Sequence, residues 1–277
     1  MISPYRYKPL QYFTITFSTT FLFWFVGAYM SFQEDVNGSH MGFLLAGLVA
    51  PFIISFVMIL KSGCMNLRND FISRLIDPRR IRPTSLPAFI FIMPMSVAAS
   101  IAISLLFGGS LSQFQLAEGF SFSSGFIPVL FLLILAATFE ELGWRGYAFD
   151  SLQSRYNFFI ASLVFSLLWS FWHFPLIFVK DSYQYEILHE NIWFCANFFI
   201  SIIPMGIIIS WICIKNRKSV LAAIIFHFII NMSQEVLDIS SLTKCIQTVV
   251  LLLVAAAIIF VEKELFFSKV PVPAEEH

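Results

Sequence analysis

The chain has 277 residues, of which 58% are hydrophobic and 17% aromatic, while only 12% are charged. A water-soluble domain carries about 25% charged residues, so this composition excludes that class. The formal net charge is zero, which leaves no electrostatic basis for binding nucleic acid. The apolar runs are long rather than short and alternating, and therefore indicate an all-α, polytopic membrane protein.

A single integral membrane domain is predicted over residues 1–277, with eight transmembrane helices. The tail 264–277 is rich in proline and polar residues, and we expect it to be disordered. In chain order, the predicted spans cover residues 11–32, 42–60, 86–107, 126–149, 157–179, 192–214, 220–236 and 245–261.

The basic residues predict the orientation of these spans. Alternate loops collect fifteen lysines and arginines, against two in the remaining loops. Cytosolic loops of membrane proteins carry the excess of such residues, so both termini are expected in the cytosol. The protein would lie in the cell membrane of a prokaryote or the endoplasmic reticulum of a eukaryote.

The loop after the second span contains a short amphipathic pattern. Leu67, Phe71 and Leu75 fall near one helical face, with Arg68 and Arg74 off that face. This spacing predicts a short interfacial helix, and a solvated connector is the alternative.

Polar residues interrupt three of the apolar spans. An ionisable side chain near mid-membrane costs roughly 2.5–3.5 kcal/mol, and such groups are usually buried against each other or against water. We therefore expect these side chains to meet at one site. They are Glu140, Glu141 and Arg145 in one span, His173 in the next, and His227 with Asn231 in a third.

Helical geometry separates the two glutamates. Neighbouring residues on a helix point about 100° apart, so only one of Glu140 and Glu141 can face a given point. Glu141 and Arg145 are four residues apart, the spacing of a helical ion pair, which leaves Glu140 free. His227 and Asn231 have the same spacing and can offer two donors to one oxygen. Together with His173, these groups could activate water and hold an oxyanion.

Other interpretations of these residues remain open. A membrane histidine or asparagine often only bonds a neighbouring helix, and a transporter could use the same residues as an ion or proton relay. Glu140, His173 and His227 could also form a two-histidine, one-carboxylate zinc site. No HExxH motif occurs. A zinc peptidase also needs a further carboxylate as base, and Glu141 would instead be paired with Arg145. A metal-free site without a cofactor is therefore favoured.

Three motifs resemble those of a known membrane family. EELGWR at 140–145 is similar to the EExxxR motif of the CAAX-protease and bacteriocin-processing (ABI) family. WSFWH at 169–173 resembles its FxxxH motif, with Trp169 where the family usually has Phe. HFIIN at 227–231 resembles its HxxxN motif. The resemblance covers about residues 126–236 and is strongest to archaeal type II CAAX prenyl endopeptidases, the Ras-converting enzymes.

The resemblance implies an intramembrane endopeptidase that removes the last three residues of prenylated CAAX proteins. Its partners would be that substrate and membrane lipids, and its site would lie in the cytosolic half of the bilayer. By this resemblance, Glu140 is the general base, His173 helps to bind water, His227 and Asn231 form the oxyanion hole, and Glu141 with Arg145 supports the site.

Overall fold

The computed structural model describes residues 5–33, 38–117 and 129–268. Within these ranges the chain is helical, and its extended pairing is confined to one isolated bridge between Leu116 and Leu237. The prediction of an all-helical polytopic membrane protein is confirmed. Six segments are long and apolar enough to cross a membrane, namely Pro9–Ser31, His40–Leu60, Pro83–Phe107, Phe158–Phe178, Ile192–Lys215 and Ser241–Val261.

The two remaining predicted spans are shorter helices. Residues 126–149 correspond to α5 (Val129–Gly143), whose predicted start lies outside the described residues, continued by a π-helical turn and α6 (Phe149–Gln153). Residues 220–236 correspond to α10 (Val220–Glu235), which is apolar and 16 residues long. The count of eight spans therefore stays a prediction.

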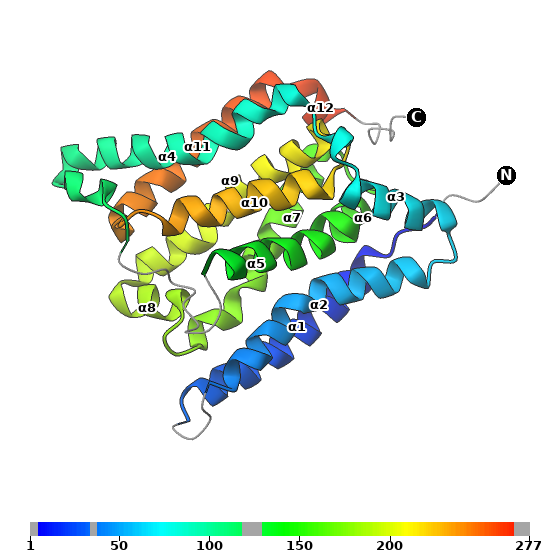
Figure 1. Cartoon of the computed structure of the whole chain (residues 1–277), viewed down its shortest axis with the longest axis horizontal. Coiled ribbons are helices and arrows are strands. Elements are labelled where there is room, and N and C mark those ends of the chain that lie inside the picture. The colour runs from blue at the N-terminus through cyan, green and yellow to red at the C-terminus, as the bar shows by residue number, and fades with distance from the viewer. Residues whose placement is uncertain (1–4, 34–37, 118–128, 269–277) are drawn as a thin grey trace.

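Helix α5 and helix α10, which carry two of the three motifs, lie side by side inside the bundle. Helix α2 packs on α5, α5 on α10, and α10 on both α4 and α9. Figure 1 shows α1 with α2 along one side, α4 with α11 along the other, and α5 and α10 between them. The other helices are α1 (Pro9–Ser31), α2 (His40–Leu60), α3 (Met65–Ile76), α4 (Leu86–Ser104), α7 (Phe158–Trp172), α8 (Tyr183–Glu190), α9 (Ile192–Lys215), α11 (Ser241–Val261) and α12 (Lys263–Phe267).

Buried polar bonds connect helices across the apolar interior. The indole of Trp172 on α7 donates to the hydroxyl of Thr20 on α1 at 3.0 Å, and that hydroxyl donates to the carbonyl of Gly47 on α2 at 3.0 Å. Interhelical bonds of this kind contribute about 0.6 kcal/mol each in a membrane protein. They fix which faces of α1, α2 and α7 meet.

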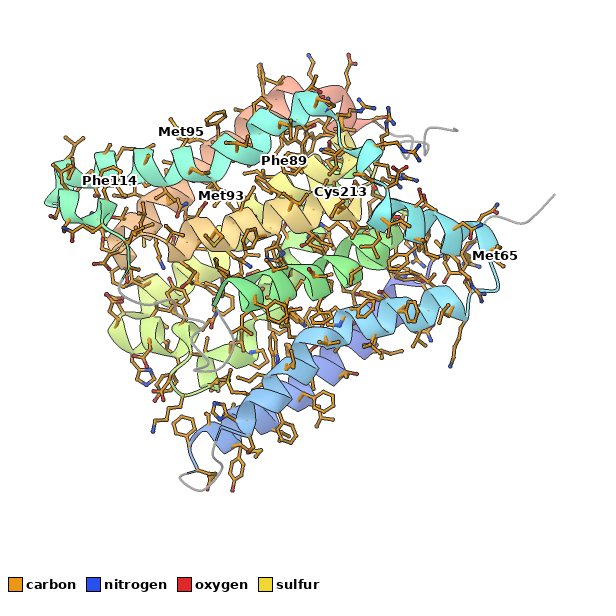
Figure 2. All side chains as sticks on the ribbon, in the orientation of Figure 1. Met65, Phe89, Met93, Met95, Phe114 and Cys213 are labelled. Atoms are coloured by element: carbon orange, nitrogen blue, oxygen red, sulfur yellow. The ribbon has the colours of Figure 1, made fainter. Side chains whose placement is uncertain are left out.

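Helix α4 has one face buried in the bundle and another face exposed. Phe89 and Met93 are buried, and Phe89 contacts the ring of Phe226 on α10 edge-on at 6.1 Å. Met95 is 59% exposed and points away from the bundle (Figure 2). Exposed apolar side chains on a long apolar helix form a surface suited to lipid rather than water.

The predicted helix in the loop after α2 is present as α3, but one of its arginines lies differently. Leu67 and Phe71 are buried, as the amphipathic pattern predicts. Arg74, which was expected off the apolar face, is only 1% exposed. The prediction of its position is wrong because its partners come from a distant part of the chain.

The ordered part of the C-terminal region extends beyond residue 264. Helix α12 continues to Phe267, and Phe266 is fully buried, with its ring 4.8 Å from that of Phe158. The predicted disordered tail therefore does not begin at residue 264. Residues 269–277 lie outside the described residues.

Candidate active site

Glu140 is held by two indole groups at the end of α5. Its side chain is 6% exposed, and its Oε2 accepts from Nε1 of Trp169 at 2.7 Å and from Nε1 of Trp144 at 3.3 Å. Within the described part of the chain, Oε1 accepts no hydrogen bond. One oxygen of the carboxylate is thus fixed, while the other is free to take a proton or bind a ligand.

Glu141 points in a different direction from Glu140 and is fully buried. Its Oε1 accepts from Nη1 of Arg145 at 2.9 Å, so the predicted helical ion pair is present. The same oxygen lies 2.8 Å from Nδ1 of His227 on α10. Glu141 therefore joins the first motif to the third, a contact that the spacing of residues along α5 did not predict.

Arg145 extends this cluster to α9 and α7. Its Nη2 lies 3.3 Å from the hydroxyl of Ser210 and 3.4 Å from the carbonyl of Gly206. Its guanidinium lies over the ring of Phe165 at 4.4 Å. Because neither member of the Glu141–Arg145 pair touches solvent, each charge depends on the other for its stabilisation.

The helix changes its hydrogen-bonding pattern just after the glutamates. Residues Trp144–Ala148 form a π-helical turn, called here the π segment. Gly143 precedes it, and a Cβ at this position would lie 2.5 Å from a backbone carbon of Pro51 on α2. Only glycine allows so close an approach of two helices. Single π turns inside α-helices are rare and frequent at functional sites.

His173 lies at the C-terminal end of α7. It caps the helix, and Pro175 follows in a 3₁₀ turn. Its Nδ1 lies 2.8 Å from the carbonyl oxygen of Trp169, which can only accept, so Nδ1 carries the proton. Its ring contacts Trp172 edge-on at 4.9 Å, and Glu140 and His227 are both within electrostatic range.

His227 and Asn231 share one face of α10 but differ in their contacts. His227 is 4% exposed and is held by Glu141 through Nδ1. Asn231 is half-buried one turn later, and its amide makes no hydrogen bond among the described residues. The free edge of the imidazole and the free amide are therefore both available to a ligand.

Trp169 is the residue whose importance the sequence interpretation missed. Its indole donates to Glu140, its ring lies 5.3 Å from that of His227, and its carbonyl accepts from His173. From the sequence it was noted only as standing where the similar motif usually has Phe. The chemical difference between the two residues, an indole N–H, was the signal that could have indicated a bond to a carboxylate.

The spacing of the ionisable side chains also bears on metal binding. Among residues 5–33, 38–117 and 129–268, no three His, Cys, Asp or Glu side chains are grouped so as to hold a metal ion.

Fold and site together define a polytopic membrane protein with a buried carboxylate–imidazole cluster built by α5, α7 and α10. The family model "Type II CAAX prenyl endopeptidase Rce1-like" matches residues 122–233. A relative named CAAX prenyl protease 2, from Methanococcus maripaludis, is 58% identical over 269 residues, covering 97% of this chain and 99% of the relative. The chain belongs to the Rce1-like CAAX prenyl endopeptidase family. Membership makes it a protease, and its apolar helices make it an integral membrane protein.

Proposed function

We propose that the protein removes the C-terminal tripeptide of prenylated CAAX proteins, using Glu140 to activate a water molecule. The observation that carries this proposal is the state of the Glu140 carboxylate. Two indoles fix its Oε2, its Oε1 accepts no hydrogen bond among the described residues, and it interacts electrostatically with His173. A buried, oriented carboxylate with one free oxygen has the properties required of a general base.

The two histidines differ in what they can offer the reaction. Since Nδ1 of His173 donates to a backbone carbonyl, its neutral ring presents Nε2 as an acceptor. It can therefore accept from the same water that donates its other proton to Glu140. The unpaired Nε2 and the electrostatic interaction of His173 with Glu140 support the family role in which His173 helps to bind the water.

The oxyanion would be held by His227 and Asn231. Nδ1 of His227 faces a carboxylate oxygen and must donate to it, so donation from Nε2 requires the doubly protonated ring. The Asn231 amide can donate in any protonation state, and it is the simpler of the two oxyanion donors.

The orientation of the protein determines which substrates can reach this site. A prenylated C-terminus is anchored in the cytosolic leaflet, and the fifteen-to-two distribution of basic residues predicts cytosolic termini. Cysteines introduced into loop 61–85 should react with an impermeant reagent only from the cytosolic side. Reaction from the opposite side would contradict the predicted orientation.

The direct test of the base is cleavage of a farnesylated CAAX peptide by purified protein. Glu140→Gln should lower kcat by about 10²–10⁴-fold, because the amide cannot accept a proton from water. Glu264→Gln, on the exposed surface of α12, is the matched control and should keep full activity. Near-wild-type turnover by folded Glu140→Gln protein would refute the assignment. Loss of wild-type activity with a chelator would instead favour a zinc enzyme.

A further inference from the structure

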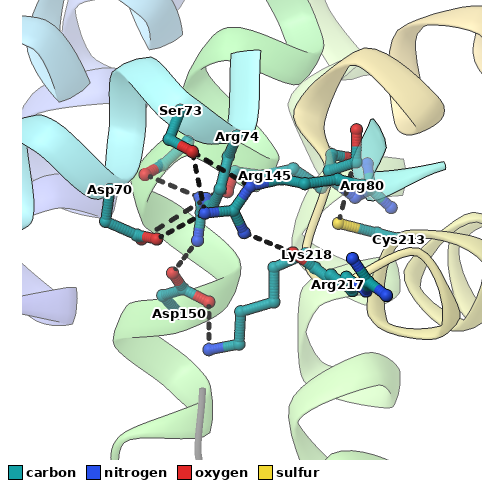
Figure 3. A network of polar contacts seen from close by, with 11 residues as sticks. Asp70, Ser73, Arg74, Arg80, Arg145, Asp150, Cys213, Arg217 and Lys218 are labelled. Atoms are coloured by element: carbon teal, nitrogen blue, oxygen red, sulfur yellow. Dashed lines mark hydrogen bonds and ion pairs between the residues drawn. The ribbon is translucent and has the colours of Figure 1, made fainter. Parts of the chain in front are cut away.

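A buried arginine outside the three motifs contacts the backbone of the first motif. Arg74 on α3 is 1% exposed. Its Nη2 donates to the carbonyl oxygens of Arg145 and Gly146, and its Nη1 donates to the carboxylate of Asp150 (Figure 3). Burial of an arginine is costly unless its charge is compensated, so these contacts of Nη1 and Nη2 with the first motif and Asp150 indicate a specific role.

The carbonyls that Arg74 reaches lie in the π segment. A change from four-residue to five-residue hydrogen bonding leaves a carbonyl without its usual amide partner, and a buried carbonyl needs another donor. Arg74 donates to two carbonyls of this segment. Gly146 allows the close packing that this requires, because a Cβ there would lie 2.7 Å from the ring of Phe71, also on α3.

The same cluster of charges fixes the start of α10. The second oxygen of Asp150 accepts from Nζ of Lys218 at 3.1 Å. Lys218 and Arg217 both have left-handed backbones, with φ of 58° and 55°, a conformation that non-glycine residues rarely adopt. Ser219 then caps α10, the helix that carries His227.

A second arginine braces this left-handed turn. Nη1 of Arg80 donates to the carbonyl of Arg217 at 2.7 Å, and its Nη2 donates to the hydroxyl of Ser73 on α3 at 3.0 Å. Figure 3 shows these side chains converging between α3, α6 and the entry to α10. The turn is thus held by Asp150 of α6 and by Arg80, which follows α3 in the chain.

We infer that Arg74 is a positioning residue for the proposed protease. It holds the π segment directly, and through Asp150 and Lys218 it holds the start of α10. The π segment directly follows Glu141, and the start of α10 precedes His227. Holding both segments therefore keeps Glu141 and His227 aligned with each other. The inference rests on the proposed function, since its consequence is a change in peptide cleavage. Misplacement of reacting groups by about 1 Å can cost roughly 10²-fold in rate.

The test compares variants of Arg74 with a control that contacts the same side chain. Arg74→Lys keeps the charge and can still pair with Asp150, but lacks the planar fork that reaches both carbonyls. Arg74→Met removes every contact. Asp70→Asn is the matched control, because Asp70 Oδ2 lies 3.6 Å from Nε of Arg74. Asparagine also keeps an oxygen that can accept from Nη2 of Arg80, which lies 3.5 Å from Asp70 Oδ1.

Two measurements on detergent-solubilised, full-length protein decide the question. Kinetics with a farnesylated CAAX peptide should show Arg74→Lys lowering kcat at least about tenfold with KM within about twofold, and Asp70→Asn near wild type. Hydrogen exchange should accelerate at residues 144–150 and 217–222 in Arg74→Lys, with little change in melting temperature. If Arg74→Met fails to fold, Asp150→Asn takes its place and should accelerate exchange at both segments.

Unchanged exchange at both segments, or exchange that rises uniformly with a lower melting temperature, would overturn the positioning role. Unchanged kcat per folded Arg74→Lys molecule would also overturn it. Failure of the wild-type protein to cleave the peptide would refute the proposed function instead. In that case the exchange comparison still decides whether Arg74 holds the two segments.

Discussion

Removal of one charge from the Glu141–Arg145 pair should destabilise the protein severely. Both side chains have no exposed surface, and Nη1 and Oε1 are 2.9 Å apart. Glu141→Gln would leave the guanidinium with only neutral acceptors on α9, at 3.3 and 3.4 Å. Breaking a buried pair in this way costs about 3–5 kcal/mol. We expect Arg145→Met to cost a similar amount, because it leaves the buried Glu141 carboxylate with only the His227 imidazole as a partner.

The double variant separates the free-energy cost of an unpaired buried charge from the cost of lost packing. Glu141→Gln with Arg145→Met removes both charges while keeping similar volumes, so its cost should fall well below the sum of the two single costs. The assay is reversible unfolding in mixed detergent micelles. Glutamine at 141 retains an oxygen that can accept from His227, so the effect of the single change reports on charge.

Lys215 and Glu262 provide the matched control for this cycle. Their ion pair is 2.8 Å long but 38% and 29% exposed. Exposed pairs of this kind contribute about 0–1 kcal/mol, so Lys215→Gln should cost little. Equal losses in Lys215→Gln and Glu141→Gln would refute the reasoning from burial. Strict additivity in the double variant would refute the reasoning from charge compensation.

Four further outcomes are expected. Asn231→Ala should lower kcat about 10²–10³-fold with little change in KM, whereas full activity of Asn231→Asp would contradict an amide donor to an oxyanion. Gly143→Ala should lower the melting temperature more than Gly146→Ala, because the new Cβ at 143 would meet the α2 backbone, whereas that at 146 would meet a side-chain ring. Equal melting temperatures of the two variants would contradict this reasoning. Trp169→Phe keeps the packing but removes one bond to a carboxylate, so unfolding measurements should show a loss of about 1.5–3 kcal/mol. Burial alone would raise the pKa of Asp150, but the neighbouring arginine and lysine outweigh it and hold the pKa below its ordinary value of 3.8. The stability that Asp150 contributes is therefore complete above that value and lost as pH falls further, and pH-dependent melting of Asp150→Asn should show a weaker decline in this acid range.

Contacts within one helix could be predicted from the sequence. Apolar runs located the long helices because length and hydropathy alone determine whether a segment suits a membrane. The Glu141–Arg145 pair was predictable because four residues span one helical turn. The different directions of Glu140 and Glu141 followed from the same geometry.

Contacts between distant segments could not be predicted in this way. Glu141 and His227 are 86 residues apart, and Arg74 and Asp150 are 76 apart, so each pair depends on how whole helices pack. Burial of Arg74 went unrecognised because an arginine near an apolar face is usually solvated. The π segment has no periodicity that distinguishes it from an ordinary helix.

The contacts of α5 with later helices have a consequence for synthesis of the protein. Arg145 depends on acceptors 61 and 65 residues further along the chain, and Glu141 on an imidazole 86 residues further. At about 5–20 residues per second, a ribosome needs roughly 4–17 s to complete that interval. During this time α5 and the π segment carry Glu140 and the Glu141–Arg145 pair without their partners on later helices, and a charged side chain near mid-membrane costs roughly 2.5–3.5 kcal/mol. The segment should therefore stay with the insertion machinery until α9 and α10 emerge, so that the candidate site is assembled last.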